Sequence, residues 1–397
     1  MPDPVLLFML VAAIGIGWWL GRMERRHYRY RSNTALSGNR LSRDYFVGLN
    51  FLLNEQPDRA IETFVQALEV NGDTIDTHIA LGNLFRLRGE ADRAVRIHQN
   101  LLARPVLTTG QSEQVQLELA RDFMRLGVFD RAERLLGTLI RQCENEETAM
   151  AAKRLMVDLY EREKDWQSAL DVAVPQLTRQ DHALKRAAAH WLCELAEHEI
   201  ETGSPGPARK HLKRALSVDA GCVRANWIYA DIEHRSGQYR NEIRILRRIR
   251  DQDSDMVPIT LAPIQHAFDL LADEDGLISF LRDQIEKAPY VSFVLLLAER
   301  LKAREGIESA TRLVSEQLQH NPSLRGIDYL MDLYLQEVPD NEIQHLRLLK
   351  RHTEQLMAQR PRYRCKSCGF HGERLYWQCP SCRQWGTIKP ITGLEGE

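Results

Sequence analysis

The sequence contains none of the short motifs that mark the common hydrolase and nucleotide-binding sites. It has no G-x-x-x-x-G-K-[ST] phosphate loop, no G-x-S-x-G nucleophile turn and no H-E-x-x-H zinc-protease motif. Its thirteen histidines are dispersed, and His98 lies where a helical repeat needs a core residue. We therefore predict that the chain is not an enzyme.

The chain also lacks the strong positive charge of a typical nucleic-acid-binding protein. It has 53 Lys and Arg residues against 55 Asp and Glu residues, a formal net charge of −2. Short basic runs do occur, but such a run on a helix is usually a solvated face. We expect no nucleic-acid partner.

Cysteines are few, and four of the seven form two C-x-x-C pairs, Cys365/Cys368 and Cys379/Cys382. Four thiolates at this spacing can bind one zinc or iron ion tetrahedrally and leave no position open for substrate. We predict one structural metal ion in a metal module at residues 359–397. Two disulfides or four unrelated thiols are the alternative. The module is too short to bury its own core, so metal binding supplies most of its folding free energy, about 10–16 kcal/mol.

Four aromatic residues lie close to these cysteines in the sequence: Tyr363, Tyr376, Trp377 and Trp385. We expect them to form a hydrophobic shell over the metal; stacking on nucleic-acid bases is the weaker alternative. The other cysteines, Cys143, Cys193 and Cys222, are an odd set scattered through helical sequence, as expected in a reducing compartment.

Charge is absent between Asp3 and Arg22, and Pro4 to Gly21 is apolar. This run reaches the lower limit for a membrane-spanning helix. No positive charge precedes it, which argues against a signal peptide. Five arginines follow within ten residues, so the positive-inside rule leaves that flank in the cytoplasm. We expect a transmembrane helix at 1–21, a basic linker at 22–40 and a cytoplasmic remainder in a single-pass membrane protein; a buried core helix is the alternative.

The middle of the chain repeats itself. Asp58-Arg59-Ala60 recurs at 92–94 and 130–132, and related alanines follow at Ala169, Ala208 and Ala310. Counted from Ala60, these alanines are 34, 38, 37, 39 and 102 residues apart, and 102 is three times 34. A period of 34 is that of the tetratricopeptide repeat, a pair of antiparallel helices. Small residues lie twelve positions before most of these alanines and before Glu242, which falls in the same frame, at Gly48, Gly82, Ala120, Ala196, Ala230 and Ala298. We predict an all-α tetratricopeptide superhelix of about eight repeats over 41–322, degenerate around 258–290, and a terminal helical pair at 323–358.

Such repeats bind partners on a concave surface lined by the first helix of each unit. On this frame Asn83 and Arg86 of one repeat and Arg121 and Arg125 of the next face the groove. We predict that these four residues bind a partner, with an acidic peptide or a C-terminal carboxylate as the matching ligand. Ordinary solvent-facing residues are the alternative.

Several stretches resemble the lipopolysaccharide assembly protein B family of Gram-negative inner membranes. They are Arg40-Leu-Ser-Arg-Asp-Tyr45, Leu81-Gly-Asn-Leu-Phe-Arg86 with Arg96-Ile-His-Gln99, Tyr376-Trp-Gln-Cys379 and Ile388-Lys-Pro-Ile391. The resemblance implies a rubredoxin-like tail whose metal ligands are the four paired cysteines. It also implies an adaptor that promotes destruction of the deacetylase LpxC by the membrane protease FtsH and is antagonised by a PbgA-type membrane regulator.

Two other functions remain open. One is a scaffold for the lipopolysaccharide transport machinery. The other, from a different class, is an RNA-binding regulator that would use the basic residues of the metal module, namely Arg360, Arg362, Arg364, Lys366, Arg374, Arg383 and Lys389.

Overall fold

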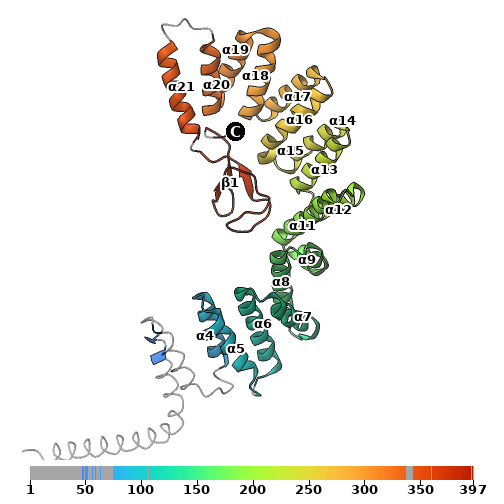
Figure 1. The fold of residues 1–397 in the computed structure, drawn as a ribbon, viewed down its shortest axis with the longest axis vertical. Helices are drawn as coiled ribbons and strands as arrows, with labels where there is room; N and C mark the ends of the chain where they lie inside the picture. The colour runs from blue at the N-terminus through green and yellow to red at the C-terminus, as the bar shows by residue number, and fades with distance from the viewer. Residues whose placement is uncertain are drawn as a thin grey trace, which may run out of the picture. The chain divides into compact units, whose positions relative to one another are not determined.

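The computed structural model describes residues 75–397, except 106, 337–342, 359, 395 and 397, together with a few isolated residues between 47 and 63. The chain divides into two compact units, Met1–Ala152 and Lys153–Glu397, which are considered separately (Figure 1). The expected transmembrane helix and basic linker lie outside the described residues. Among the residues that are described, no helix is both long and apolar enough to span a bilayer.

The first unit consists of antiparallel helical pairs. Gly89 and Gly127, with φ of 88° and 75°, make the tight turns inside the first two pairs. The helices are α4 (Ile75–Leu87), α5 (Ala91–Leu102), α6 (Thr109–Leu126) and α7 (Phe129–Gln142), followed by α8 (Glu146–Glu163), which runs into the second unit.

The second unit continues the pattern and ends in a small sheet. Its helices are α9 (Trp166–Ala173), α10 (Leu177–Gln180), α11 (His182–Glu201), α12 (Pro205–Val218), α13 (Val223–Arg235), α14 (Tyr239–Arg247), α15 (Ile249–Gln252), η2 (Ser254–Thr260), α16 (Leu261–Leu270), α17 (Glu274–Lys287), α18 (Val291–Glu305), α19 (Ile307–His320), α20 (Leu324–Tyr334) and α21 (Ile343–Ala358). The strands β1 (Tyr363–Cys365), β2 (His371–Gly372) and β3 (Ile388–Pro390) form an antiparallel sheet in the order β2-β1-β3.

The repeat positions are the packing centres of the helical pairs. The alanines that define the period, at 94, 132, 169, 208 and 310, are all fully buried, as are the small residues Ala120, Ala196 and Ala298. Small side chains at these positions let neighbouring helices approach closely. The helical pairs and the separate small sheet confirm the predicted all-α repeat array with a C-terminal module.

The repeat that is degenerate in sequence is also irregular in structure. Its first helix begins as the 3-10 helix η2, which contains Pro258, and α16 then adds only ten residues. Proline lacks the backbone N–H that an α-helix interior needs, so the chain starts this repeat with a tighter turn. The irregular start lies beside β3 of the metal module.

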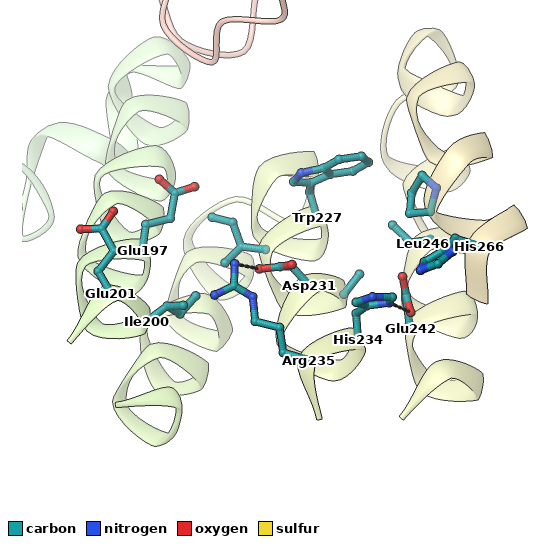
Figure 2. Close-up of a pocket in the computed structure, with 13 residues that line it drawn as sticks. Glu197, Ile200, Glu201, Trp227, Asp231, His234, Arg235, Glu242, Leu246 and His266 are labelled. Carbon is teal, nitrogen blue, oxygen red and sulfur yellow. Dashed lines mark hydrogen bonds and ion pairs between the residues drawn. The ribbon is translucent and has the colours of Figure 1, made fainter. Parts of the chain in front are cut away.

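The first helices of the central repeats leave an open pocket of about 440 Å³ in the second unit. Helices α11, α13 and α16 supply most of its lining, and Figure 2 shows Glu197, Trp227 and His266 around it.

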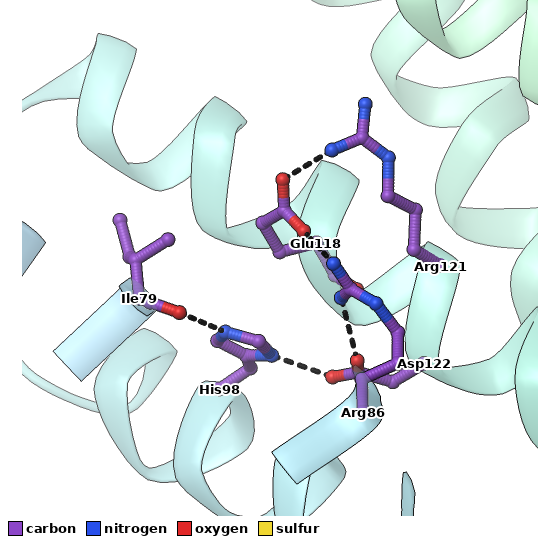
Figure 3. A network of polar contacts seen from close by, with 6 residues as sticks. All are labelled: Ile79, Arg86, His98, Glu118, Arg121 and Asp122. Carbon is purple, nitrogen blue, oxygen red and sulfur yellow. Dashed lines mark hydrogen bonds and ion pairs between the residues drawn. The ribbon is translucent and has the colours of Figure 1, made fainter. Parts of the chain in front are cut away.

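In the first unit, a buried charge network joins α4, α5 and α6 (Figure 3). Asp122 is fully buried, and its carboxylate accepts a hydrogen bond from Arg86 Nη1 at 2.8 Å. Its second oxygen lies 2.5 Å from His98 Nδ1. Arg86 Nη2 also donates to Glu118 Oε2 at 2.6 Å. Removing one partner of such a network leaves an uncompensated buried charge, which costs about 3–5 kcal/mol.

Gly82 makes this network possible. A Cβ atom at position 82 would lie 2.4 Å from His98 Nε2, far closer than two such atoms approach. His98 is itself fully buried and packs directly on α4 at this point. The small residue expected from the repeat pattern is therefore required at position 82 for two reasons. It allows close helix packing, and it leaves room for His98 beside Asp122.

We predict that Gly82→Ala destabilises the α4–α6 region by about 1–3 kcal/mol, because the added methyl group displaces His98 from Asp122. Local stability is measured by hydrogen exchange of peptides from these helices. Gly110→Ala is the matched control, since Gly110 is an exposed residue of α6 with nothing within 4 Å of its would-be Cβ. If these helices are as well protected from hydrogen exchange in Gly82→Ala as in the Gly110→Ala control, the network tolerates displacement of His98.

Candidate metal centre and its docking on the repeats

The four paired cysteines converge at one end of the small sheet. Their Sγ atoms all lie within 4.8 Å of one another. The distance is 3.8 Å between Cys365 and Cys382 and 3.7 Å between Cys368 and Cys379. A tetrahedron of sulfurs bonded to zinc at about 2.3 Å has edges of about 3.8 Å. A disulfide needs about 2.05 Å, so the arrangement fits one metal ion and not two disulfides.

The two C-x-x-C turns have the same backbone geometry. Gly369 and Arg383 each lie four residues after the first cysteine of a pair, and both have positive φ, 78° and 59°. The N–H of each donates to the carbonyl of that cysteine, at 3.0 Å and 2.8 Å. Glycine adopts this conformation freely, whereas arginine pays a steric cost. Arg383 occupies this strained position, and its guanidinium lies 3.6 Å from Asp158 of α8.

The thiols differ in how readily they ionise. Burial raises the pKa of Cys365, but hydrogen bonds from the Thr387 hydroxyl and from the backbone of Cys368 and Ser367 lower it to about 6 overall. Burial raises the pKa of Cys379 to about 11. Cysteine binds a metal as the thiolate, so metal binding at neutral pH releases protons from the site. The four thiolates would hold the metal as a structural ion, and its chemistry there is to stabilise the fold of the module.

The carboxylate of Glu161 lies at the centre of the contact between the metal module and the helices of the second unit. Glu161 of α8 accepts a hydrogen bond from Trp385 Nε1 and another, at 3.0 Å, from Gln378 Nε2. Trp191 Nε1 of α11 lies 3.4 Å from the same oxygen. Trp385 is 6 % exposed and Trp191 is fully buried, so this carboxylate joins two buried indoles and the metal module.

Trp385 is enclosed by side chains from three further positions of the repeats. The His190 ring stacks on it at a centroid distance of 5.1 Å, and Trp166 meets it edge-on at 6.0 Å. The Arg224 guanidinium lies 5.8 Å from its ring centroid. Such a buried tryptophan in a packed pocket is the usual energetic centre of an interface.

Three ion pairs surround this tryptophan contact. Lys389 pairs with Asp253, Lys366 lies 3.6 Å from Asp255, and Arg383 lies 3.6 Å from Asp158. Asp253 is the N-cap of η2 and Asp255 lies within it, so the irregular repeat supplies two of the three acids. The two exposed pairs, Lys366–Asp255 and Arg383–Asp158, contribute little affinity and mainly set the orientation of the module, whereas the Lys389–Asp253 pair is partly buried.

Docking also buries polar atoms that gain no partner. His190 Nδ1 and Arg224 Nε have no hydrogen-bond partner among the described residues. Burial holds the pKa of His190 well below its usual value, and the charges of Arg224, Lys389 and Arg186 add to this effect, so the imidazole is neutral at pH 7. Arg224 itself is held by Glu194 and Glu197, each at 2.7 Å.

The structure changes the interpretation of the aromatic residues near the cysteines. Tyr363 does pack on the core of the module, with Phe370 and Leu375. Trp385 contacts the repeats instead, and Trp377 packs on the large core of the second unit. The expectation of a purely local shell is wrong for these two tryptophans, because the module has a neighbouring protein surface to bury them against.

The four predicted partner-binding residues of the early repeats have different environments. Arg86 is largely committed to Glu118 and Asp122, and Arg121 also pairs with Glu118. Asn83 is half-buried and its Oδ1 has no partner among the described residues. Arg125 is exposed. Their role in partner binding stays a prediction, with Arg86 carrying a structural role as well.

Comparison with known proteins identifies the same two parts. Residues 363–390 match the family described as rubredoxin metal binding domain, and residues 77–110 and 193–257 match tetratricopeptide repeat families. Lipopolysaccharide assembly protein B of Escherichia coli K12 is 35% identical over 393 residues, which cover 98% of this chain and 99% of that protein.

The protein of the same name from Haemophilus influenzae is 34% identical over 410 residues, with the same coverage of both chains. A solved tetratricopeptide repeat protein from Parabacteroides merdae is 15% identical and covers 66% of this chain and 99% of its own, with a TM-score of 0.32.

We predict that Cys379→Ser removes the metal and releases the module from the repeats, because Gln378 and Trp385 are positioned by the second C-x-x-C turn. The metal content measured by elemental analysis should fall from about one ion per chain to well below one. Hydroxyl-radical footprinting should show increased oxidation of Trp191 and His190.

Cys143→Ser is the control, since Cys143 lies outside the metal module. Phe293, which is fully buried in the repeat core, should stay protected in both variants. Continued protection of Trp191 in a metal-free Cys379→Ser protein would show that docking does not need the metal.

Proposed function

This chain belongs to the lipopolysaccharide assembly protein B family, and we propose that it is a non-enzymatic adaptor in lipopolysaccharide assembly at the bacterial inner membrane. The observation that carries the proposal is the docked metal module. Its four thiolates would fill the coordination sphere of one ion, and the module is held against the repeats by Trp385 and Glu161. A site with four protein ligands leaves no coordination position for substrate, and repeats of this kind act by binding partners.

More specifically, we propose that the adaptor presents the deacetylase LpxC to an FtsH-type membrane protease. A transmembrane helix at 1–21 would hold the repeats beside the protease, and a repeat surface would hold the deacetylase. Joining enzyme and protease on one molecule raises their effective concentration without requiring a new catalytic group. A PbgA-type membrane regulator would oppose this activity when lipopolysaccharide is sufficient.

A scaffold for the lipopolysaccharide transport machinery is the nearest alternative, which would use the same surfaces and differ only in its partners. For an RNA-binding regulator the module would need free basic residues, but Lys366, Arg383 and Lys389 face acidic residues of the repeats. No observation on the described residues favours RNA over protein partners.

We predict that depleting the protein lengthens the half-life of the deacetylase and leaves its rate of synthesis unchanged. The measurement is the decay of the deacetylase after translation is blocked, in cells with and without the adaptor. Wild-type protein should restore rapid decay, whereas Cys379→Ser should not. An unchanged half-life on depletion would contradict the proteolytic mechanism and leave the transport scaffold as the better account.

A further inference from the structure

The open pocket of the second unit carries an excess of negative charge beside aromatic side chains. Four carboxylates and one guanidinium line it, together with Trp227 and two histidines. Ile200, Ile228, Ala230 and Leu246 supply apolar lining. In Figure 2, Glu197 and Glu201 extend from α11 on one side, while Trp227 and Asp231 extend from α13.

Most of these charges are already partly balanced, but one is not. Glu242 lies 2.8 Å from His234 Nδ1, Glu197 holds Arg224, and Asp231 lies 2.8 Å from Arg235. Glu201 is exposed and has no ion-pair partner among the described residues. The Asp231–Arg235 pair also shows that a guanidinium is accommodated at the rim of this pocket.

The adjoining part of the same surface shows what chemistry it accepts. There the repeats bind Trp385 of the metal module, flanked by the cations Arg383 and Lys389, through carboxylates and aromatic rings. Arg224 connects the two parts, because it lies over the Trp385 ring and pairs with Glu197, which lines the pocket. The pocket therefore continues a surface that already holds a basic, tryptophan-bearing segment.

We propose that this pocket binds an arginine or lysine side chain, with an apolar neighbour, on a segment of a partner protein. Glu201 and Asp231 pair with the cation, and Trp227 contacts its alkyl stem or its charged face. The neighbouring apolar residue lies against Ile200 and Leu246. A volume of about 440 Å³ suits one long side chain and part of its neighbour, and it lies within the range of ordinary ligand pockets.

The proposal goes beyond the adaptor function and does not depend on the pathway in which the adaptor acts. Its test is binding by the purified full-length protein in detergent. The probes are two fluorescein-labelled peptides, Ala-Leu-Arg-Leu-Ala and Ala-Leu-Glu-Leu-Ala, each blocked at its C-terminus, and the readout is fluorescence anisotropy.

We expect the arginine peptide to bind and the glutamate peptide to bind at least tenfold more weakly. Glu201→Lys should weaken binding of the arginine peptide more than tenfold. Arg235→Ala should strengthen it, because an internal competitor for Asp231 is removed. Glu286→Lys is the matched control, an identical charge change at an exposed residue of α17, and should leave binding within twofold.

Two results would overturn the proposal. One is equal binding, or equal absence of binding, of the two peptides to the wild-type protein. The other is an affinity for the arginine peptide that Glu201→Lys and Glu286→Lys change by the same factor, since the effect would then reflect overall charge and not this pocket.

Discussion

The docking of the metal module on the helices of the second unit depends on the hydrogen bonds that the carboxylate of Glu161 accepts. This carboxylate accepts hydrogen bonds from Trp385 and Gln378 of the metal module and lies beside the indole N–H of Trp191. Glu161 is half-buried, and hydrogen bonds to a charged acceptor contribute more than hydrogen bonds between neutral groups. One carboxylate thus serves the indole N–H groups of two buried tryptophans.

Metal binding and docking share the same short loop of the module. Gln378 directly precedes Cys379, Arg383 directly follows Cys382, and Gln378 pairs with Trp385 across the loop. A metal that holds this turn in shape also holds the residues that bind Glu161. By thermodynamic linkage the effect is reciprocal, so docking on the repeats must raise the affinity of the cysteines for the metal. We therefore expect the module and the repeats of the second unit to fold as one unit.

Much of this protein could be predicted from its sequence, because the signals are local. The recurrence of alanines at intervals of 34 to 39 residues, or three times 34, predicts the helical pairs, and the spacing of four cysteines predicts a metal site. Docking could not be predicted, since Trp385 and Glu161 are 224 residues apart and neither carries a distinctive motif. The role of Arg86 was also only partly predictable. The repeat pattern places Arg86 in the groove, but its ion pair with the buried Asp122 of α6 is seen only in the structure. The sequence shows that the repeat around 258–290 is degenerate. That this repeat supports β3, through the ion pair of Asp253 with Lys389, is seen only in the structure.

The most direct test of the coupling between metal and docking is the metal affinity of the full-length protein with and without Glu161. Competition with a chromogenic chelator measures this affinity for wild type, for Glu161→Ala and for the control Glu286→Ala. The account predicts that Glu161→Ala binds the metal at least tenfold more weakly, although Glu161 is not a ligand, and that the control matches wild type. Equal affinities for all three proteins would contradict it, because the module would then fold around its metal independently of the repeats.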